Sequence, residues 1–193
     1  MCNRIRESLV RIPGRDARCP TPPRYNPLVS VSDHRRDAPA SITCFVLTIS
    51  DTRTEATDTS GTAIVQALEQ ANHQVTGRQL VRDEPETVRD VVLEQAGTVD
   101  VVITTGGTGL TSRDSTYEAI AGVLHKRIDG FGELFRALSF ADIGSAAMLS
   151  RACAGTIDRT AIFSLPGSEN AVRLAMTRLI LPELGHIVRE MRR

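Results

Sequence analysis

The sequence contains no tryptophan, and aromatic residues make up only 4% of its 193 residues. A platform of aromatic side chains for stacking nucleic-acid bases is therefore not expected. The chain also has no excess of charge, because 23 Lys and Arg residues balance 23 Asp and Glu residues. We expect neither a nucleic acid nor a membrane to be bound through bulk charge, although a local basic patch remains compatible with this balance.

The cysteines do not form a pattern typical of a metal or redox site. Cys2, Cys19, Cys44 and Cys153 include no C-x-x-C pair and no Cys/His cluster with zinc spacing. Cys44 and Cys153 lie in apolar segments and are expected to be small core residues. No apolar run is long enough to span a bilayer, and the basic N-terminus lacks the apolar stretch of a secretory signal. We expect a protein of the reducing cytoplasm.

The first 40 residues differ in composition from the rest of the chain. They hold six of the nine prolines and eight arginines, without a periodic apolar pattern. This composition predicts a flexible N-terminal extension over residues 1–40, followed by one domain over residues 41–193. An arm that packs on a neighbouring subunit, a basic targeting segment and a misassigned start codon are alternatives that the composition leaves open.

From residue 41 onward, short apolar runs alternate with amphipathic segments of about a dozen residues. The runs predict strands at residues 42–50, 74–81, 100–105 and 160–165. The amphipathic or small-residue segments predict helices at residues 60–72, 86–96, 115–124, 132–140, 145–155, 168–181 and 183–191, with Pro182 ending or kinking the last run. This alternation predicts a three-layer α/β/α fold, in which helices cover both faces of a mostly parallel sheet.

Four loops are expected at one edge of that sheet. Residues 50–61, the glycine loop of residues 104–114 (TTGGTGLTSRD) and residues 165–168 each follow a strand and precede a helix, so their N–H groups can face an anion. The fourth loop is Val81–Pro85. The glycine loop lacks the Lys-Ser/Thr of a Walker A motif, and Ser112 breaks the G-x-G-x-x-G pattern. Taken alone, it fits a tight strand–helix connection equally well.

The acidic residues near these loops have structural alternatives. Asp83 with Glu86, and Ser115 with Glu118, have the spacing of helix-capping pairs. Asp58 could cap the next helix in the same way, whereas Asp114 is harder to explain by packing. Several carboxylates beside N–H-rich turns together favour phosphate chemistry with Mg²⁺.

Four sequence segments together carry a family resemblance: TTGGTGLTSRDSTYEA (104–119), DTSG (58–61), DGFGELFRALSFADIGSAAMLSRACAG (129–155) and LPGSENAV (165–172). They resemble the MoaB/Mog family of molybdenum cofactor biosynthesis proteins, over about residues 42–188. Residues 130–140 (GFGELFRALSF) and 181–184 (LPEL) are most similar to the MoaB branch, which includes members thought to be inactive. Arg113 and Asp114 match the pattern of the active members.

The resemblance implies the molybdopterin-binding domain fold and a molybdopterin adenylyltransferase. Such an enzyme uses Mg-ATP to attach AMP to the terminal phosphate of molybdopterin and releases pyrophosphate. Asp83 and Asp114 match the important aspartates of the family, and we expect them to hold or orient Mg²⁺ and the triphosphate. The positions expected to bind substrate are Ser50, Asp51, Asp58, Ser60, Gly61, Thr105, Gly106, Gly107, Thr108, Gly109, Arg113, Glu118, Pro166, Gly167 and Ser168.

Two alternatives come from other functional classes. The protein could bind molybdopterin without catalysis, as a carrier or scaffold. It could also be a nucleotide hydrolase on the related fold of competence-damage-type proteins. The conversion of molybdopterin and Mg-ATP into adenylylated pterin would distinguish these alternatives.

An apolar stripe bears on assembly. Phe131, Phe135 and Leu138 follow one another at helical spacing, outside the regular strand–helix alternation. They could be ordinary core contacts. The resemblance instead implies that this region helps to build trimers, which pair into hexamers in MoaB-like members. Other proteins of molybdenum cofactor biosynthesis are candidate partners.

Overall fold

The computed structural model describes residues 39–111 and 114–193, which contain a six-stranded sheet in the order β2-β1-β3-β6-β5-β4. The strands are β1 (Thr43–Ile49), β2 (Gln74–Val81), β3 (Val101–Thr105), β4 (Lys126–Arg127), β5 (Cys153–Ile157) and β6 (Thr160–Leu165). The pairs β1–β2, β1–β3 and β3–β6 are parallel, whereas β4–β5 and β5–β6 are antiparallel. Residues 1–38, with nearly all of the predicted extension, lie outside the described residues.

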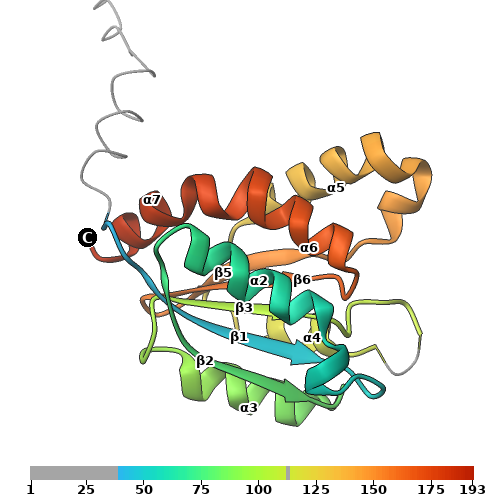
Figure 1. Cartoon of the computed structure of the whole chain (residues 1–193), viewed down its shortest axis with the longest axis horizontal. Coiled ribbons are helices and arrows are strands. Elements are labelled where there is room, and N and C mark those ends of the chain that lie inside the picture. The colour runs from blue at the N-terminus through green and yellow to red at the C-terminus, as the bar shows by residue number, and fades with distance from the viewer. Residues whose placement is uncertain (1–38, 112–113) are drawn as a thin grey trace, which may run out of the picture.

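Helices cover both faces of the sheet (Figure 1). One face carries α2 (Thr59–Gln70), α5 (Asp129–Ile143), α6 (Glu169–Ala175) and α7 (Leu181–Met191). The other face carries α3 (Pro85–Gln95) and α4 (Thr116–Ala121). The remaining turns are the 3₁₀ helices η1 (Glu55–Thr57) and η2 (Gly144–Leu149) and the π-helical turn η3 (Met176–Ile180). The predicted three-layer fold with a mostly parallel sheet is confirmed.

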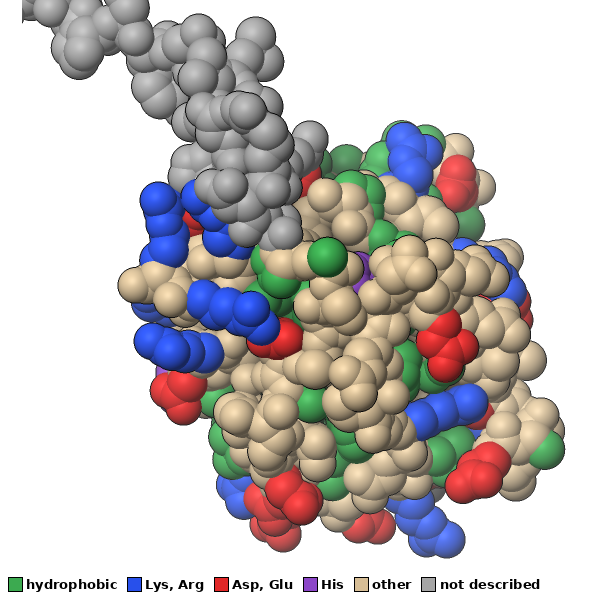
Figure 2. Space-filling model, turned by 60° about the vertical axis from the view of Figure 1, so that its left-hand side comes forward, with side chains coloured by type: hydrophobic (Ala, Val, Ile, Leu, Met, Phe, Trp, Pro, Cys, Tyr) green, Lys and Arg blue, Asp and Glu red, His purple; other side chains and the backbone are tan. Residues whose placement is uncertain are grey.

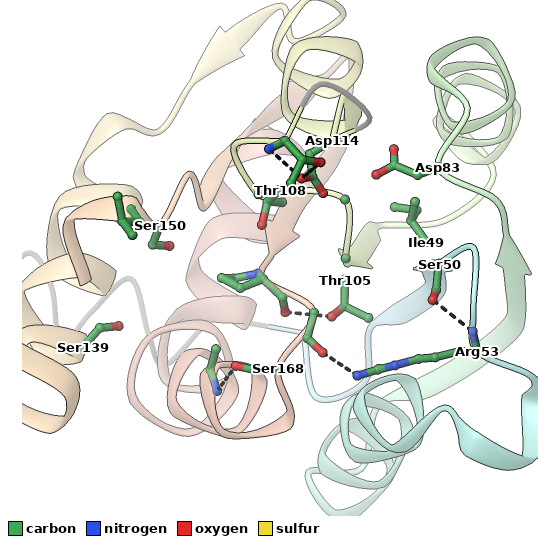
Figure 3. Close-up of a pocket in the computed structure, with 18 of the residues that line it drawn as sticks. Ile49, Ser50, Arg53, Asp83, Thr105, Thr108, Asp114, Ser139, Ser150 and Ser168 are labelled. Atoms are coloured by element: carbon green, nitrogen blue, oxygen red, sulfur yellow. Dashed lines mark hydrogen bonds between the residues drawn. The ribbon is translucent and has the colours of Figure 1, made fainter. Parts of the chain in front are cut away.

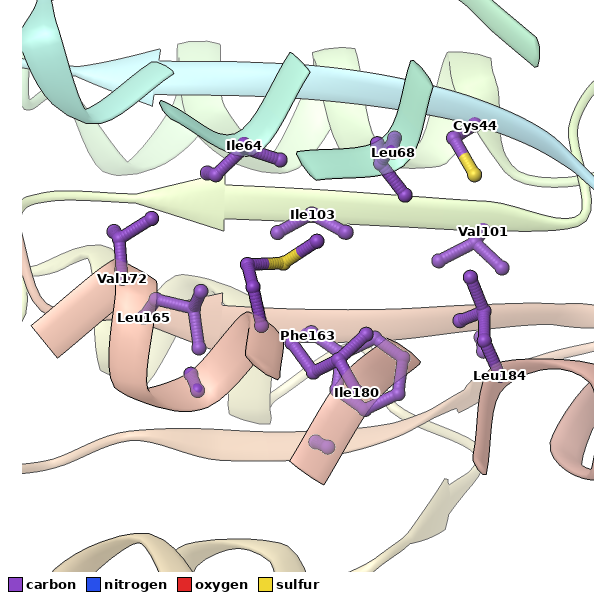
Figure 4. Packing of buried hydrophobic residues seen from close by; sticks show 14 of the residues in the cluster. Cys44, Ile64, Leu68, Val101, Ile103, Phe163, Leu165, Val172, Ile180 and Leu184 are labelled. Atoms are coloured by element: carbon purple, nitrogen blue, oxygen red, sulfur yellow. The ribbon is translucent and has the colours of Figure 1, made fainter. Parts of the chain in front are cut away.

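The alternation of side chains along each central strand divides the core into two clusters. In β1, Cys44 and Val46 pack under α2, whereas Phe45 and Leu47 pack toward α3 and α4. Figure 4 shows the first cluster, where Ile64 and Leu68 of α2 lie above β3 and Leu184 lies beside Val101, at the start of β3. Both faces of the inner strands are therefore buried, which explains why their sequences are continuously apolar.

The segment 145–155, predicted as a helix, was assigned wrongly. Only η2 is helical there, and β5 begins at Cys153 and pairs antiparallel with β6. Small apolar residues carry no clear period, so the pairing with β6 decides their conformation. A Cβ atom at Gly155 would collide with the carbonyl oxygen of Lys126 in β4. The short strands β4 and β5 were therefore missing from the prediction.

Pro182 does not break the C-terminal helix. The π-helical turn η3 precedes it, and Pro182 lies in the first turn of α7, where its missing N–H is tolerated. The chain from α6 to α7 therefore remains helical throughout, and Val172, Ile180 and Leu184 are fully buried.

Helix α5 is longer than predicted and has two apolar faces. Phe131 and Phe135 are buried in the core, where Phe131 packs edge-on against Phe163 with 5.3 Å between ring centroids. The core alternative therefore holds for these two residues of the stripe. The same segment also exposes large apolar side chains, namely Leu134, Phe140 and Ile143 on α5 and Met148 and Leu149 on η2.

The surface agrees with the balanced composition. Figure 2 shows Lys and Arg side chains gathered on one side of the face in view, with Asp and Glu side chains beside them. Cys44 and Cys153 are buried, as expected, and burial raises the pKa of Cys44 to about 12. Across the described residues, no helix combines the length and the hydropathy needed to cross a membrane.

Candidate ligand-binding site

The carboxyl ends of the four parallel strands meet at one edge of the sheet. Hydrogen bonds tie their loops together: Ser50 donates its N–H to Val81 (2.9 Å), and Gly106 donates to Leu165 (3.0 Å). The Thr105 hydroxyl donates to the Pro166 carbonyl at 2.9 Å. The loops surround a cleft of about 660 Å³, a volume typical of small-molecule sites. The four loops therefore converge as the sequence predicted.

Most of the predicted binding positions line this cleft. They are Ser50, Asp51, Asp83, Thr105, Gly106, Gly107, Thr108, Gly109, Asp114, Pro166, Gly167 and Ser168. Asp58, Ser60, Gly61 and Glu118 do not line it. Arg113 lies outside the described residues. Figure 3 shows Asp83 and Asp114 on one side of the cleft and Arg53 and Ser168 on the opposite side.

The glycine loop needs glycine at its first two positions. Gly106 and Gly107 have φ angles of 106° and 62°, in a backbone region that residues other than glycine rarely adopt. A Cβ atom at Gly106 would collide with the carbonyl oxygen of Ile49. One at Gly107 would collide with the Thr116 hydroxyl and lie 2.6 Å from the Asp83 carboxylate. These glycines allow three loops to touch, which the tight-turn interpretation alone did not require.

Asp83 points into the cleft from the loop after β2. Its carboxylate accepts the Thr116 hydroxyl at 3.0 Å and the Ser115 amide. Burial raises the pKa of Asp83, and the charges of Asp114 and Asp51 act in the same direction. The two hydrogen bonds offset only part of this. Asp83 is thus a carboxylate whose negative charge is poorly compensated by the protein, which suits an added cation.

Asp83 does not cap a helix. The N-cap of α3 is Glu84, without a side-chain capping bond, and Pro85 begins the helix. Ser115 is the N-cap of α4, also without a side-chain bond. Ser115 thus occupies the expected N-cap position without the capping bond, whereas the position expected for Asp83 is wrong, because its side chain turns toward Thr116 across the sheet edge.

Asp114 is held inside its own loop. Its carboxylate accepts the Thr111 amide at 2.9 Å, the Thr111 hydroxyl at 2.5 Å and the Gly109 amide. The bond from the Thr111 hydroxyl is the largest cause that holds the pKa of Asp114 below its usual value, and the charge of Arg151 adds to it. Asp114 is therefore ionised and closes the glycine loop at neutral pH.

Asp58 is a buried structural anchor beneath the cleft. It caps α2 by accepting the Gly61 amide at 2.9 Å, and it pairs with Arg78 at 2.6 Å. Burial alone would raise the pKa of Asp58, but hydrogen bonds from Thr48, Gly61 and Arg78 outweigh it and hold the pKa below its usual value. The capping role suggested for Asp58 is confirmed.

Arg53 was missed by the sequence analysis. Its guanidinium donates to the Ser60 hydroxyl at 2.6 Å and to the Gly167 carbonyl at 2.9 Å, and Ser60 also donates to Gly167 at 2.7 Å. Because C=O and N–H point in opposite directions in a trans peptide, this clamp turns the Ser168 amide away from Arg53. An arginine inside the first loop was the available signal.

The far wall of the cleft is apolar and was also missed. It comes from α5, η2 and α6 and consists of Phe135, Ser139, Ile143, Ala146, Leu149, Ser150 and Ala171. Figure 3 shows Ser139 and Ser150 on this side, away from Asp83. Ile143 and Leu149 are more than half exposed and offer a surface for a flat ring. This wall depends on how α5 packs across the sheet, and no local motif marks it.

The carboxylates of the cleft fit one kind of metal site. No group of three or more His, Cys, Asp or Glu side chains suited to a metal ion occurs among residues 39–111 and 114–193. Mg²⁺ bound with a triphosphate needs only one or two protein carboxylates. Asp83, with Asp114 and Asp51 near it, fits that requirement.

A cleft at the carboxyl edge of a parallel sheet, with glycine turns, carboxylates and an apolar wall, is typical of α/β proteins that bind phosphorylated small molecules. Residues 45–186 match the family described as "Probable molybdopterin binding domain". A curated relative from Bacillus cereus, "Molybdenum cofactor biosynthesis protein B", is 54% identical over 168 residues, covering 86% of this chain and 99% of the relative. The chain belongs to the MoaB/Mog family of molybdenum cofactor biosynthesis proteins.

Solved structures agree with this assignment. The crystal structure titled "Molybdenum cofactor biosynthesis protein B" superposes with a TM-score of 0.77 at 54% identity, covering 80% of this chain and 98% of that one. The "tungsten cofactor synthesizing protein MoaB from Pyrococcus furiosus" has a TM-score of 0.73 at 37% identity and covers 81% and 100%.

Proposed function

We propose that this protein adenylylates molybdopterin, as its step in molybdenum cofactor biosynthesis. The terminal phosphate oxygen of molybdopterin would attack the α-phosphorus of ATP. A new P–O bond forms to AMP, the bond between the α-phosphorus and its bridging oxygen breaks, and pyrophosphate leaves. Asp83, an under-compensated carboxylate in a cleft of N–H-bearing turns, is the observation that carries this proposal.

The cleft contains no histidine among its lining residues, and the reaction needs none. A phosphate monoester has a second pKa of about 6, so the nucleophile is already largely ionised at neutral pH. The protein has to bring two anions together and hold them in line. The backbone amides of Gly107, Thr108 and Ser168 are the groups we assign to the phosphates, since the Gly106 and Gly109 amides already donate to Leu165 and Asp114.

Mg²⁺, when bound with the triphosphate, would supply positive charge to the phosphoryl oxygens. Asp83 would hold it, with Asp51 and Asp114 beside it. The apolar wall with Ile143 and Leu149 would take a flat ring, because ring contacts with apolar side chains need no buried polar partner. The cleft thus separates a polar phosphate half from an apolar ring half.

One observation favours a second candidate, namely molybdopterin binding without catalysis. The Asp114 carboxylate already accepts bonds from Thr111 and Gly109, so it can serve the loop alone. In that case the cleft would hold the pterin phosphate, and the protein would act as a carrier or scaffold.

The test is incubation of the purified protein with molybdopterin and Mg-ATP. Adenylylated pterin and an equal amount of pyrophosphate are expected. Tight pterin binding without product would favour the carrier. Release of AMP or ADP from ATP without any pterin would favour the hydrolase alternative, for which the structural likeness to a CinA protein at 17% identity shows the fold alone.

A further inference from the structure

Arg151 lies behind the glycine loop, between η2 and β5, and contacts it at several points. Its guanidinium donates to the Thr108 carbonyl at 3.0 Å, to the Asp114 carbonyl at 3.0 Å and to the Gly109 carbonyl. The side chain is only 20% exposed, and it also pairs with Glu118. One cation therefore gathers three carbonyls of the glycine loop.

The guanidinium itself is held in place from a second side. Its carbon lies 5.2 Å from the ring centroid of Tyr117 in α4, within the range of a cation–π contact. Glu118, the next residue of the same helix, neutralises its charge. Arg151 thus links the glycine loop to the start of α4 in a fixed geometry.

The carbonyls that Arg151 binds belong to peptide groups whose amides serve the two aspartates. In a trans peptide, C=O and N–H point in opposite directions. The Thr108 carbonyl faces Arg151, and the Gly109 amide of the same peptide donates to the Asp114 carboxylate. The Asp114 carbonyl faces Arg151, and the Ser115 amide of that peptide donates to the Asp83 carboxylate.

We propose that Arg151 is a positioning residue that fixes these two peptide groups and, through them, the places of Asp83 and Asp114 in the cleft. Arg151 does not line the cleft itself, so it acts without touching substrate. The inference rests on the proposed adenylylation, because the consequence of misplaced aspartates is a slower reaction. Its structural part, the orientation of the loop, is measurable in the protein without substrate.

The first variant is Arg151→Gln, with Arg127→Gln as the matched control. Arg127 contacts Tyr117 and Asp129 nearby but makes no bond to the described residues of the glycine loop. We expect amide hydrogen exchange in the peptide covering residues 106–117 to be faster by about tenfold or more in Arg151→Gln. In Arg127→Gln this segment is expected to exchange as in the unmutated protein.

The kinetic readout separates positioning from loss of folded protein. We expect the kcat for adenylylation to fall by about a hundredfold in Arg151→Gln, the effect of misplaced reacting groups. Mg-ATP should still bind by calorimetry with a stoichiometry near one, because every molecule stays folded, although the loosened loop and the misplaced aspartates weaken the affinity. A merely structural role would instead lower the stoichiometry along with the rate.

Arg151→Lys tests the fork of the guanidinium, since it keeps the charge but reaches fewer carbonyls. We expect Arg151→Lys to have an adenylylation rate between those of Arg151→Gln and the unmutated protein, and the glycine-loop amides to exchange hydrogen at an intermediate rate. Unchanged exchange of the loop in Arg151→Gln would overturn the proposal, as would full activity of Arg151→Lys. An inactive unmutated protein would overturn the adenylylation, whereas faster loop exchange in Arg151→Gln would still support the positioning role.

Discussion

Asp83→Asn is the substitution that most directly tests the site, because the structure predicts opposite effects on activity and stability. At neutral pH it removes the charge from a carboxylate that the neighbouring Asp114 and Asp51 repel. If Asp83 holds the cation of Mg-ATP, the adenylylation rate should fall by about a hundredfold or more, or about 2.7 kcal/mol in the activation barrier.

Stability should not fall with the rate. The asparagine oxygen can still accept the Thr116 hydroxyl and the Ser115 amide, and its NH₂ group would donate where the carboxylate was repelled. The variant should therefore melt at the same temperature as the unmutated protein or higher, by about 2 °C. If Asp83 capped a helix, the substitution would instead lower the melting temperature, but the N-cap of α3 is Glu84.

The pH dependence has a definite sign. The folded protein raises the pKa of Asp83 above its unfolded value, so this side chain opposes folding as soon as the unfolded chain can ionise it. The stability advantage of the asparagine should grow as the pH rises from the unfolded pKa to the raised pKa and stay constant above it. It should vanish below the unfolded value of about 3.9, where the unmutated side chain is also neutral.

The assay combines initial rates of pterin adenylylation with thermal melts at several values of pH. Asp90→Asn is the control, because Asp90 is an exposed carboxylate on α3 paired with Arg89, outside the cleft. The control should leave the rate unchanged. Normal turnover of Asp83→Asn, or a melting temperature lowered by several degrees, would refute the reasoning.

Three further predictions address the loop and the assembly. Asp114→Asn should lower the rate by about a hundredfold and leave pterin affinity within a few-fold, whereas normal turnover would assign Asp114 to loop closure only. Gly107→Ala should lower the free energy of unfolding by about 2 kcal/mol and abolish turnover, because the backbone φ is 62° and the added methyl group would collide with the Thr116 side chain. Scanning calorimetry and adenylylation rates would measure the two effects. Exposed apolar side chains outside the cleft, at Leu134, Phe140 and Met148, should make the protein a trimer or a pair of trimers. Light scattering should then give at least three times 21.0 kDa, and Phe140→Asp should lower this mass; a monomer mass for the unmutated protein would contradict the prediction.

Much of the site could be predicted because it follows strand ends. The convergence of the loops at Ser50, Asp83, Gly106 and Pro166 follows from the alternation of strands and helices, since parallel strands end at one edge. The Arg53 clamp and the hold of Arg151 on the glycine loop could not be predicted. Each joins residues far apart in the chain, at separations of 114 and 43 positions, and only packing brings them together.

Local patterns were sufficient where burial repeats along the chain. The apolar runs of β1, β3 and β6 specify central strands, because both of their faces must be covered by helices. They were insufficient for residues 145–155, whose small residues suit a helix or a strand, and for Asp83, whose spacing suited a cap. Tertiary structure decided both: pairing with β6 satisfies the backbone of β5, and Thr116 across the sheet edge offers the Asp83 carboxylate a hydrogen bond in the cleft.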